Sequence, residues 1–84
     1  MQIVMDIESD GLLESVTKIH CLSYQEVGKK EIISLVTYED MINLLNQKDL
    51  EIVGHNIIRY DIPVLEKILG IHVTARLIDT LPLS

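Results

Sequence analysis

The chain has 84 residues, which is enough for one small domain and too few for two. Almost half of the residues are hydrophobic, yet Phe and Trp are absent, so the core must be built from Ile, Leu and Val. This aliphatic, β-branched bias favours an α/β domain with a buried sheet. A net charge of −6, from 13 acidic and 7 basic residues, excludes a protein that binds nucleic acid through a broad basic surface.

No segment is apolar over the length that a bilayer requires, and the N-terminus lacks the basic and apolar regions of a secretory signal. The single cysteine, Cys21, lies in an apolar stretch, which is typical of a buried free thiol and requires no oxidising compartment. We therefore expect a cytoplasmic protein without a membrane partner.

The first half of the chain predicts a meander of short strands. Apolar runs with alternation predict strands at residues 2–6, 17–24 and 31–36. A loop at residues 8–15 joins the first two strands, and a polar turn at Gly28 joins the next two. Connections of this length favour antiparallel pairing.

The second half predicts helices and parallel strands. Thr37 has the position of an N-cap, with Asp40 three residues later, for a first helix that ends at residues 46–49. A strand at residues 51–54 is too distant in sequence from the first strand for a hairpin, so we expect it to pair parallel to that strand. A second helix is predicted at residues 61–69.

The end of the sequence predicts a helix stop and a fifth strand. Gly70 has the position of a helix C-cap, and residues 71–78 lead to the fifth strand. Asp79 and Pro82 have the pattern of the opening of a third helix, in which Asp79 would be the N-cap.

Two acidic residues follow the first apolar run. Side chains alternate along a strand, so Asp6 and Glu8 lie on one face while Ile7 points into the core. Two carboxylates held this close repel each other unless a cation lies between them, and such hard oxygen ligands suit Mg²⁺ or Mn²⁺. The alternative is that these residues and Asp10 are solvated acids before an Asp-Gly turn.

A second polar cluster lies between the fourth predicted strand and the second helix. The carboxyl ends of adjacent parallel strands form a ligand crevice, so Asp61 can come beside Asp6 and Glu8, and three carboxylates there would hold two divalent ions. The alternatives are that Asp61 is the N-cap of the second helix and that Asn56 is only a turn former. His55 could equally be a structural residue.

Three blocks of the sequence, in order, carry a resemblance to a known family. They are Asp6-Ile7-Glu8 with residues 12–18 and His20-Cys21 behind it, His55-Asn56 followed by Tyr60-Asp61 and Pro63, and residues 78–81 with Leu83-Ser84. Over nearly its whole length the chain resembles the DEDD (DnaQ-like) 3′ to 5′ exonucleases, and among them the N-terminal proofreading domain of T7-like phage DNA polymerases.

The resemblance implies a fold, a reaction and partners. The fold would be the N-terminal portion, over residues 1–84, of a single ribonuclease H-like α/β domain, whose mixed sheet joins an antiparallel three-strand meander to parallel strands, with helices. The reaction would be metal-dependent 3′ to 5′ hydrolysis of DNA phosphodiesters to nucleoside monophosphates, with two Mg²⁺ or Mn²⁺ as cofactors. A single-stranded or frayed 3′ end of DNA would be the substrate, in the cytoplasm of a bacterial or phage-infected cell.

The resemblance also implies roles for individual residues. Asp6 would bridge both metal ions, Glu8 would bind the ion that carries the attacking water, and Asp61 would help to hold the second ion. Three residues would bind substrate: Leu12 as an apolar wedge against the terminal bases, Ser9 through its backbone N–H, and Asn56 by steadying the site. Many members of the wider family have one residue fewer between this Asn and Asp, whereas the T7-like polymerases share the longer spacing.

One family motif is missing from residues 62–84. The family has a Tyr or His four residues before a final Asp, but Asp79 has Ala75 at that offset. We therefore expect the fourth carboxylate to lie beyond Ser84, and the chain alone to be weakly active. Without the remaining helices the sheet would expose apolar surface and associate with the rest of a polymerase chain or with a second copy. The alternative function is a non-catalytic or split-gene fragment that acts as a nucleic-acid or protein binding module.

Overall fold

The computed structural model describes residues 1–11 and 15–80. Within these residues the chain forms a mixed sheet of five strands, two α-helices and one π-helical turn, η1. The strands are β1 (Gln2–Ser9), β2 (Ile19–Glu26), β3 (Ile32–Leu35), β4 (Glu51–Gly54) and β5 (Arg76–Asp79), and the helical segments are α1 (Tyr38–Leu45), η1 (Ile57–Asp61) and α2 (Ile62–Leu69). Neither α-helix of this described part is long and apolar enough to span a bilayer.

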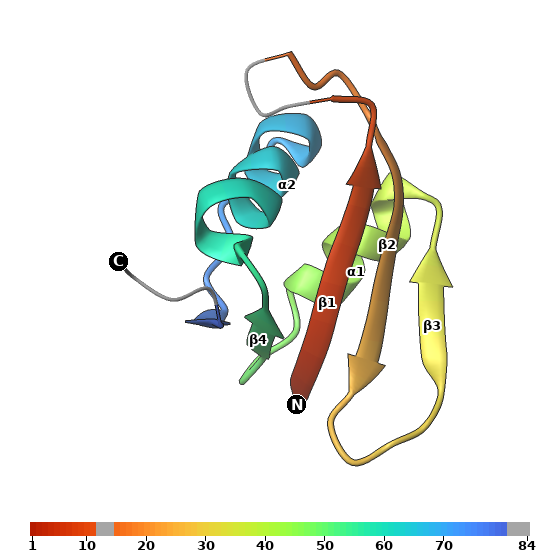
Figure 1. The fold of residues 1–84 in the computed structure, drawn as a ribbon, viewed down its shortest axis with the longest axis vertical. Helices are drawn as coiled ribbons and strands as arrows, with labels where there is room; N and C mark the ends of the chain where they lie inside the picture. Colours follow the sequence, from red (N-terminus) through yellow and green to blue (C-terminus); the bar gives the residue numbers. More distant parts are fainter. Residues whose placement is uncertain (12–14, 81–84) are drawn as a thin grey trace.

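The strand order across the sheet is β3-β2-β1-β4-β5, so β1 is the central strand (Figure 1). β1 pairs antiparallel with β2, and β2 pairs antiparallel with β3. β1 pairs parallel with β4, and β4 pairs parallel with β5. The predicted α/β class is therefore confirmed, including the mixed sheet in which an antiparallel meander joins parallel strands. The carboxyl ends of β1 and β4 meet at the same edge, as expected for parallel neighbours.

The core lies on one face of this sheet. Side chains alternate along β1: Ile3, Met5 and Ile7 are buried, whereas Val4, Asp6 and Glu8 are exposed. The buried face packs against apolar residues of both helices, which are Met41, Leu44 and Leu45 of α1 and Ile62, Val64 and Leu65 of α2. Figure 1 shows α1 behind β1 and β2, with no described helix in front of them. Asp6 and Glu8 therefore project from the uncovered face of the sheet.

The boundaries of the first two strands differ from the prediction. β1 continues to Ser9, instead of ending at Asp6, because its antiparallel pairing with β2 extends through a register irregularity between Glu8 and Ser9. β2 begins later than predicted, at Ile19. The two residues before it, Thr17 and Lys18, direct their backbone N–H groups to the carboxylate of Asp10 instead of to a neighbouring strand.

The helix ends follow their local sequence signals. The predicted N-cap Thr37 accepts a hydrogen bond from the backbone N–H of Asp40 at 3.2 Å. Gly70 ends α2 with φ 68, a left-handed conformation that favours glycine. Asp79 is the last residue of β5, and the predicted third helix, with Pro82, lies outside the described residues.

Gly54 allows η1 to pack directly against β1. A Cβ atom at this position would lie 2.3 Å from Cγ2 of Ile57 and 3.1 Å from the carbonyl oxygen of Met5. Ile57 is completely buried, so it has little room to move away. The missing side chain therefore sets the close approach that brings η1, and Asp61 at its end, to the carboxyl end of β1.

We expect the substitution Gly54→Ala to lower the free energy of unfolding by about 1–3 kcal/mol, because η1 must shift to relieve the contact with Ile57. Urea denaturation followed by circular dichroism measures this loss. Gly11→Ala is the matched control: its Cβ would approach the flexible Ser15 hydroxyl at 3.1 Å, so it should change stability by about 0.5 kcal/mol or less. Equal stability of the two variants would contradict the packing role of Gly54.

Candidate active site

The first part of the candidate site is the uncovered face of β1. Asp6 lies opposite Ser23 of β2 and Glu8 lies opposite Cys21, and both carboxylates are exposed. The predicted common face of Asp6 and Glu8 is confirmed. The prediction of a buried thiol is wrong, because Cys21 shares this uncovered face and is only partly buried.

The second part is Asp61, at the junction of η1 and α2. Its side chain is 5% exposed, and its Oδ2 atom has no hydrogen-bond partner. The alternative role as an N-cap is wrong: Asp61 has helical backbone angles, φ −59 and ψ −49, and its side chain makes no capping hydrogen bond. Burying a polar atom without a hydrogen-bond partner raises the free energy of the folded state, so the position of Asp61 destabilises the fold.

The electrostatic surroundings of Asp61 connect it to β1. Burial, followed by the negative charge of Asp6, raises the pKa of Asp61 from 3.8 to about 7. The backbone N–H of Ile7 acts in the opposite direction, while Asp79 adds a smaller upward contribution. Asp61 therefore lies within electrostatic reach of Asp6, as the order of the parallel strands predicts.

Asp6 and Glu8 differ in their electrostatic effect on Asp61. Asp6 is among the charges that raise the pKa of Asp61, whereas Glu8, two residues further along β1, is not. In the part of the chain that the structure describes, no three His, Cys, Asp or Glu side chains are grouped closely enough to hold a metal ion. The unpartnered Oδ2 of Asp61, near a second carboxylate, nevertheless has the chemistry that suits a proton or a hard divalent cation.

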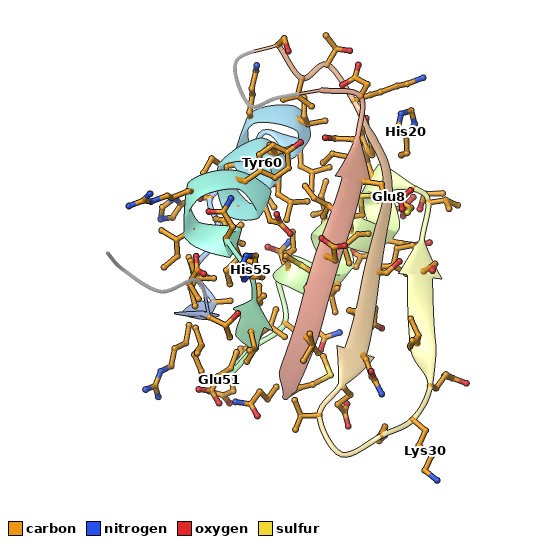
Figure 2. The ribbon with its side chains drawn as sticks, viewed as in Figure 1. Glu8, His20, Lys30, Glu51, His55 and Tyr60 are labelled. Atoms are coloured by element: carbon orange, nitrogen blue, oxygen red, sulfur yellow. The ribbon has the colours of Figure 1, made fainter. Side chains whose placement is uncertain are left out.

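Asp79 holds the segment that leads to Asp61. Its carboxylate accepts hydrogen bonds from the backbone N–H of Asn56 at 2.9 Å and of Ile58 at 3.0 Å. Asp79 therefore caps an earlier segment of the chain, and its predicted role as the N-cap of a following helix lies outside the described residues. Asn56 has φ 61, as its alternative reading as a turn former predicts, and His55 is exposed beside the end of β4 (Figure 2).

Tyr60 is a site residue to which the sequence assigned no role. In Figure 2 its side chain extends from the helical segment toward the carboxyl end of β1. Its hydroxyl donates a hydrogen bond to the carbonyl oxygen of Gly11 at 2.6 Å and shares a 2.5 Å hydrogen bond with Oγ of Ser9. Ser9, expected to act through its backbone N–H, thus also engages its hydroxyl. The other predicted substrate-binding residue of this region, Leu12, lies outside the described residues.

Asp10, just after β1, is hydrogen-bonded to the two residues that precede β2. Its carboxylate accepts hydrogen bonds from the backbone N–H groups of Thr17 at 2.9 Å and Lys18 at 3.1 Å, and from the Thr17 hydroxyl. The Thr17 side-chain hydrogen bond, followed by the two backbone hydrogen bonds, lowers the pKa of Asp10 to about 2. Asp10 is therefore an exposed acid with a structural role, in addition to preceding Gly11.

We expect Asp61 to make the protein less stable as the pH rises from about 4 to about 7. In that range the unfolded chain has lost the Asp61 proton and the folded chain retains it. The free energy of unfolding therefore falls by about 1.4 kcal/mol for each pH unit, and it stops falling above the folded-state pKa of Asp61. Asp61→Asn keeps the size of the side chain but does not titrate. Its free energy of unfolding, from urea denaturation in a metal-free buffer, should exceed that of the parent at about pH 8 and lack this slope.

Asp10→Asn is the control for this measurement. The lowered pKa of Asp10 stabilises the folded state above about pH 4, and this stabilisation is lost as the pH falls toward 2. The Asp10→Asn variant should therefore retain the slope between about pH 4 and about pH 7. A parent and an Asp61→Asn variant with the same pH dependence would show that Asp61 is not buried as described.

Comparison with known proteins relates the sequence to a phage polymerase. No protein-family model matches the chain. The chain is similar to a DNA-directed DNA polymerase of Escherichia phage T7, with 35% identity over an alignment of 94 residues that covers 98% of this chain. The chain spans 13% of the length of that polymerase. This similarity supports a polymerase-related origin for the chain.

Proposed function

We propose that the chain carries catalytic carboxylates of a metal-dependent 3′ to 5′ exonuclease, the proofreading segment of a phage-type DNA polymerase. The observation that carries this proposal is the buried carboxyl of Asp61, whose Oδ2 lacks a partner, within reach of the charge of Asp6. The strand order, with β1 central between an antiparallel and a parallel neighbour, is compatible with a ribonuclease H-like fold. The similarity to the T7 polymerase supports DNA as the substrate.

Three side chains would hold the metal ions. Asp6 and Glu8 would hold the ion that activates the attacking water, and Asp6 and Asp61 would help to hold the second ion. When bound, Mg²⁺ or Mn²⁺ lowers the pKa of a water molecule and stabilises the departing 3′ oxygen of the phosphodiester. The central strand β1 fixes Asp6 and Glu8 on one face, and the burial of Asp61 excludes water from its side of the site, which strengthens its interaction with a cation.

The charge of the chain supports a requirement for cations. The chain has a net charge of −6, and the DNA backbone is itself a polyanion. A 3′ end can approach Asp6 and Glu8 only when their charges are balanced. Bound divalent ions supply that balance, so DNA binding at this site depends on them and should be abolished by a chelator.

We expect Mn²⁺ or Mg²⁺ to stabilise the folded chain at about pH 8, where the carboxyl of Asp61 is ionised. A rise in the thermal midpoint with metal concentration measures this effect, and a metal concentration of about 100 times the Kd adds about 2.7 kcal/mol. Asp6→Asn and Asp61→Asn should lose most of the stabilisation. Glu31→Gln, which removes an exposed carboxylate before β3, is the charge-matched control and should retain it.

We also expect slow, stepwise shortening of a 5′-labelled single-stranded DNA from its 3′ end in the presence of Mn²⁺. The rate should be low because residues 62–84 contain no Tyr or His four residues before an Asp. Asp6→Asn should reduce shortening to background on a denaturing gel. Binding of DNA without shortening, unchanged by Asp6→Asn, would contradict the exonuclease and favour a non-catalytic binding module.

A further inference from the structure

We infer that Tyr60 is a positioning residue, which holds the carboxyl end of β1 in place for the 3′-terminal nucleotide of a bound single strand. This inference rests on the proposed function, because it takes the carboxylates of β1 as the centre of the site. Tyr60 immediately precedes Asp61 in η1. Ser9, its partner, immediately follows Glu8 in β1. The hydrogen bonds that join Tyr60 to Ser9 and Gly11, called the tether below, therefore lie directly beside the proposed metal-binding carboxylates.

The tether is a compact hydrogen-bonded triangle. The Tyr60 hydroxyl donates its proton to the carbonyl oxygen of Gly11 at 2.6 Å. The Ser9 hydroxyl lies 2.5 Å from the Tyr60 oxygen and 3.2 Å from the same Gly11 carbonyl, so its proton can go to either acceptor. Two hydroxyl groups and one carbonyl thus satisfy one another, and the phenol is the member that comes from η1.

Residues 9–11 are held from two sides. On one side, Tyr60 ties Ser9 and Gly11 to η1, across 49 residues of sequence in the case of Gly11. On the other side, the backbone N–H of Asp10 donates to the carbonyl of Lys18 at 3.2 Å, next to the hydrogen bonds that the Asp10 carboxylate receives. Without the phenol hydroxyl, Ser9 stays paired with β2 and Asp10 keeps its hydrogen bonds, but the hydrogen bonds that join residues 9–11 to η1 in the described part of the chain are lost. Residues 9–11 then lose their fixed position relative to η1.

The role of the hydroxyl is separable from the role of the ring. Tyr60 is half-buried and its ring packs against the hydrophobic core, a contact that Tyr60→Phe preserves. Asp6 and Glu8 keep their pairing with β2 in this variant, and Asp61 is not part of the hydrogen-bonded triangle, so metal binding should be unaffected. A nucleotide bound at those carboxylates lies over the end of β1, and its binding should weaken when that end is free to move.

The experiment compares the full chain with Tyr60→Phe, Ser9→Ala and the double variant. Two quantities are measured for each protein: Mn²⁺ affinity by thermal shift, and affinity for a fluorescent oligothymidylate with phosphorothioate linkages, which resist cleavage, by anisotropy in saturating Mn²⁺. Tyr24→Phe is the matched control, because it removes a phenol hydroxyl of β2 that makes none of the hydrogen bonds found among the described residues.

We expect Tyr60→Phe to weaken oligonucleotide binding about tenfold while Mn²⁺ affinity changes by less than about twofold. Ser9→Ala should weaken binding in the same way, and the double variant should be no weaker than Tyr60→Phe alone, since both remove one shared tether. Tyr24→Phe should bind like the parent.

Each other result has a distinct meaning. If the parent binds the oligonucleotide and Tyr60→Phe binds it equally well, the positioning role of Tyr60 is overturned and the proposed function stands. If Tyr60→Phe loses Mn²⁺ and oligonucleotide together, the hydroxyl has a general structural role and the inference is again overturned. If the parent itself binds neither Mn²⁺ nor the oligonucleotide, the proposed function fails, and the inference that depends on it fails with it.

Discussion

A carboxyl group buried within reach of a second carboxylate is the constraint on which the candidate site depends. The side chain of Asp61 is almost fully buried, and burial together with the charge of Asp6 makes its ionised form unfavourable. The fold imposes this arrangement through backbone packing, because Gly54 lets η1 approach β1 more closely than any side chain would allow. A hydrophobic residue at position 61 would avoid the cost, and the cations that we propose for this site would offset it.

The sheet and the caps could be predicted because their signals are local. Alternation along β1, the Thr37 cap and the Gly70 stop each depend on residues a few positions apart, and each is confirmed. The boundaries could not be predicted equally well, because they depend on partners elsewhere. Ser9 belongs to β1 only because β2 continues to pair with it, and Thr17 is kept out of β2 by the carboxylate of Asp10.

The candidate site also has features that the sequence predicts and features that it does not. The common face of Asp6 and Glu8 follows from the period of a strand, and the approach of Asp61 to Asp6 follows from the parallel order of β1 and β4. The tether from Tyr60 and the capping of Asn56 by Asp79 join residues far apart in sequence, so no spacing rule reveals them. The alternative role of Asp61 as an N-cap follows from its place before a helix, and it is wrong because helical backbone continues through that residue from η1 into α2.

The π-helical form of η1 bears on how this segment tolerates a change of length. Its closing hydrogen bond runs from the N–H of Ile62 to the carbonyl of Ile57, which encloses one residue more than an α-helical turn does. In the exonuclease family that we propose for this chain, many members have one residue fewer between the Asn and the Asp. A wider turn accommodates the additional residue as a local bulge. The backbone on either side then keeps its direction, and Asp61 keeps its position at the end of the turn. The π-helical turn therefore holds one residue more than an α-helical turn without a break in the helical backbone before Asp61.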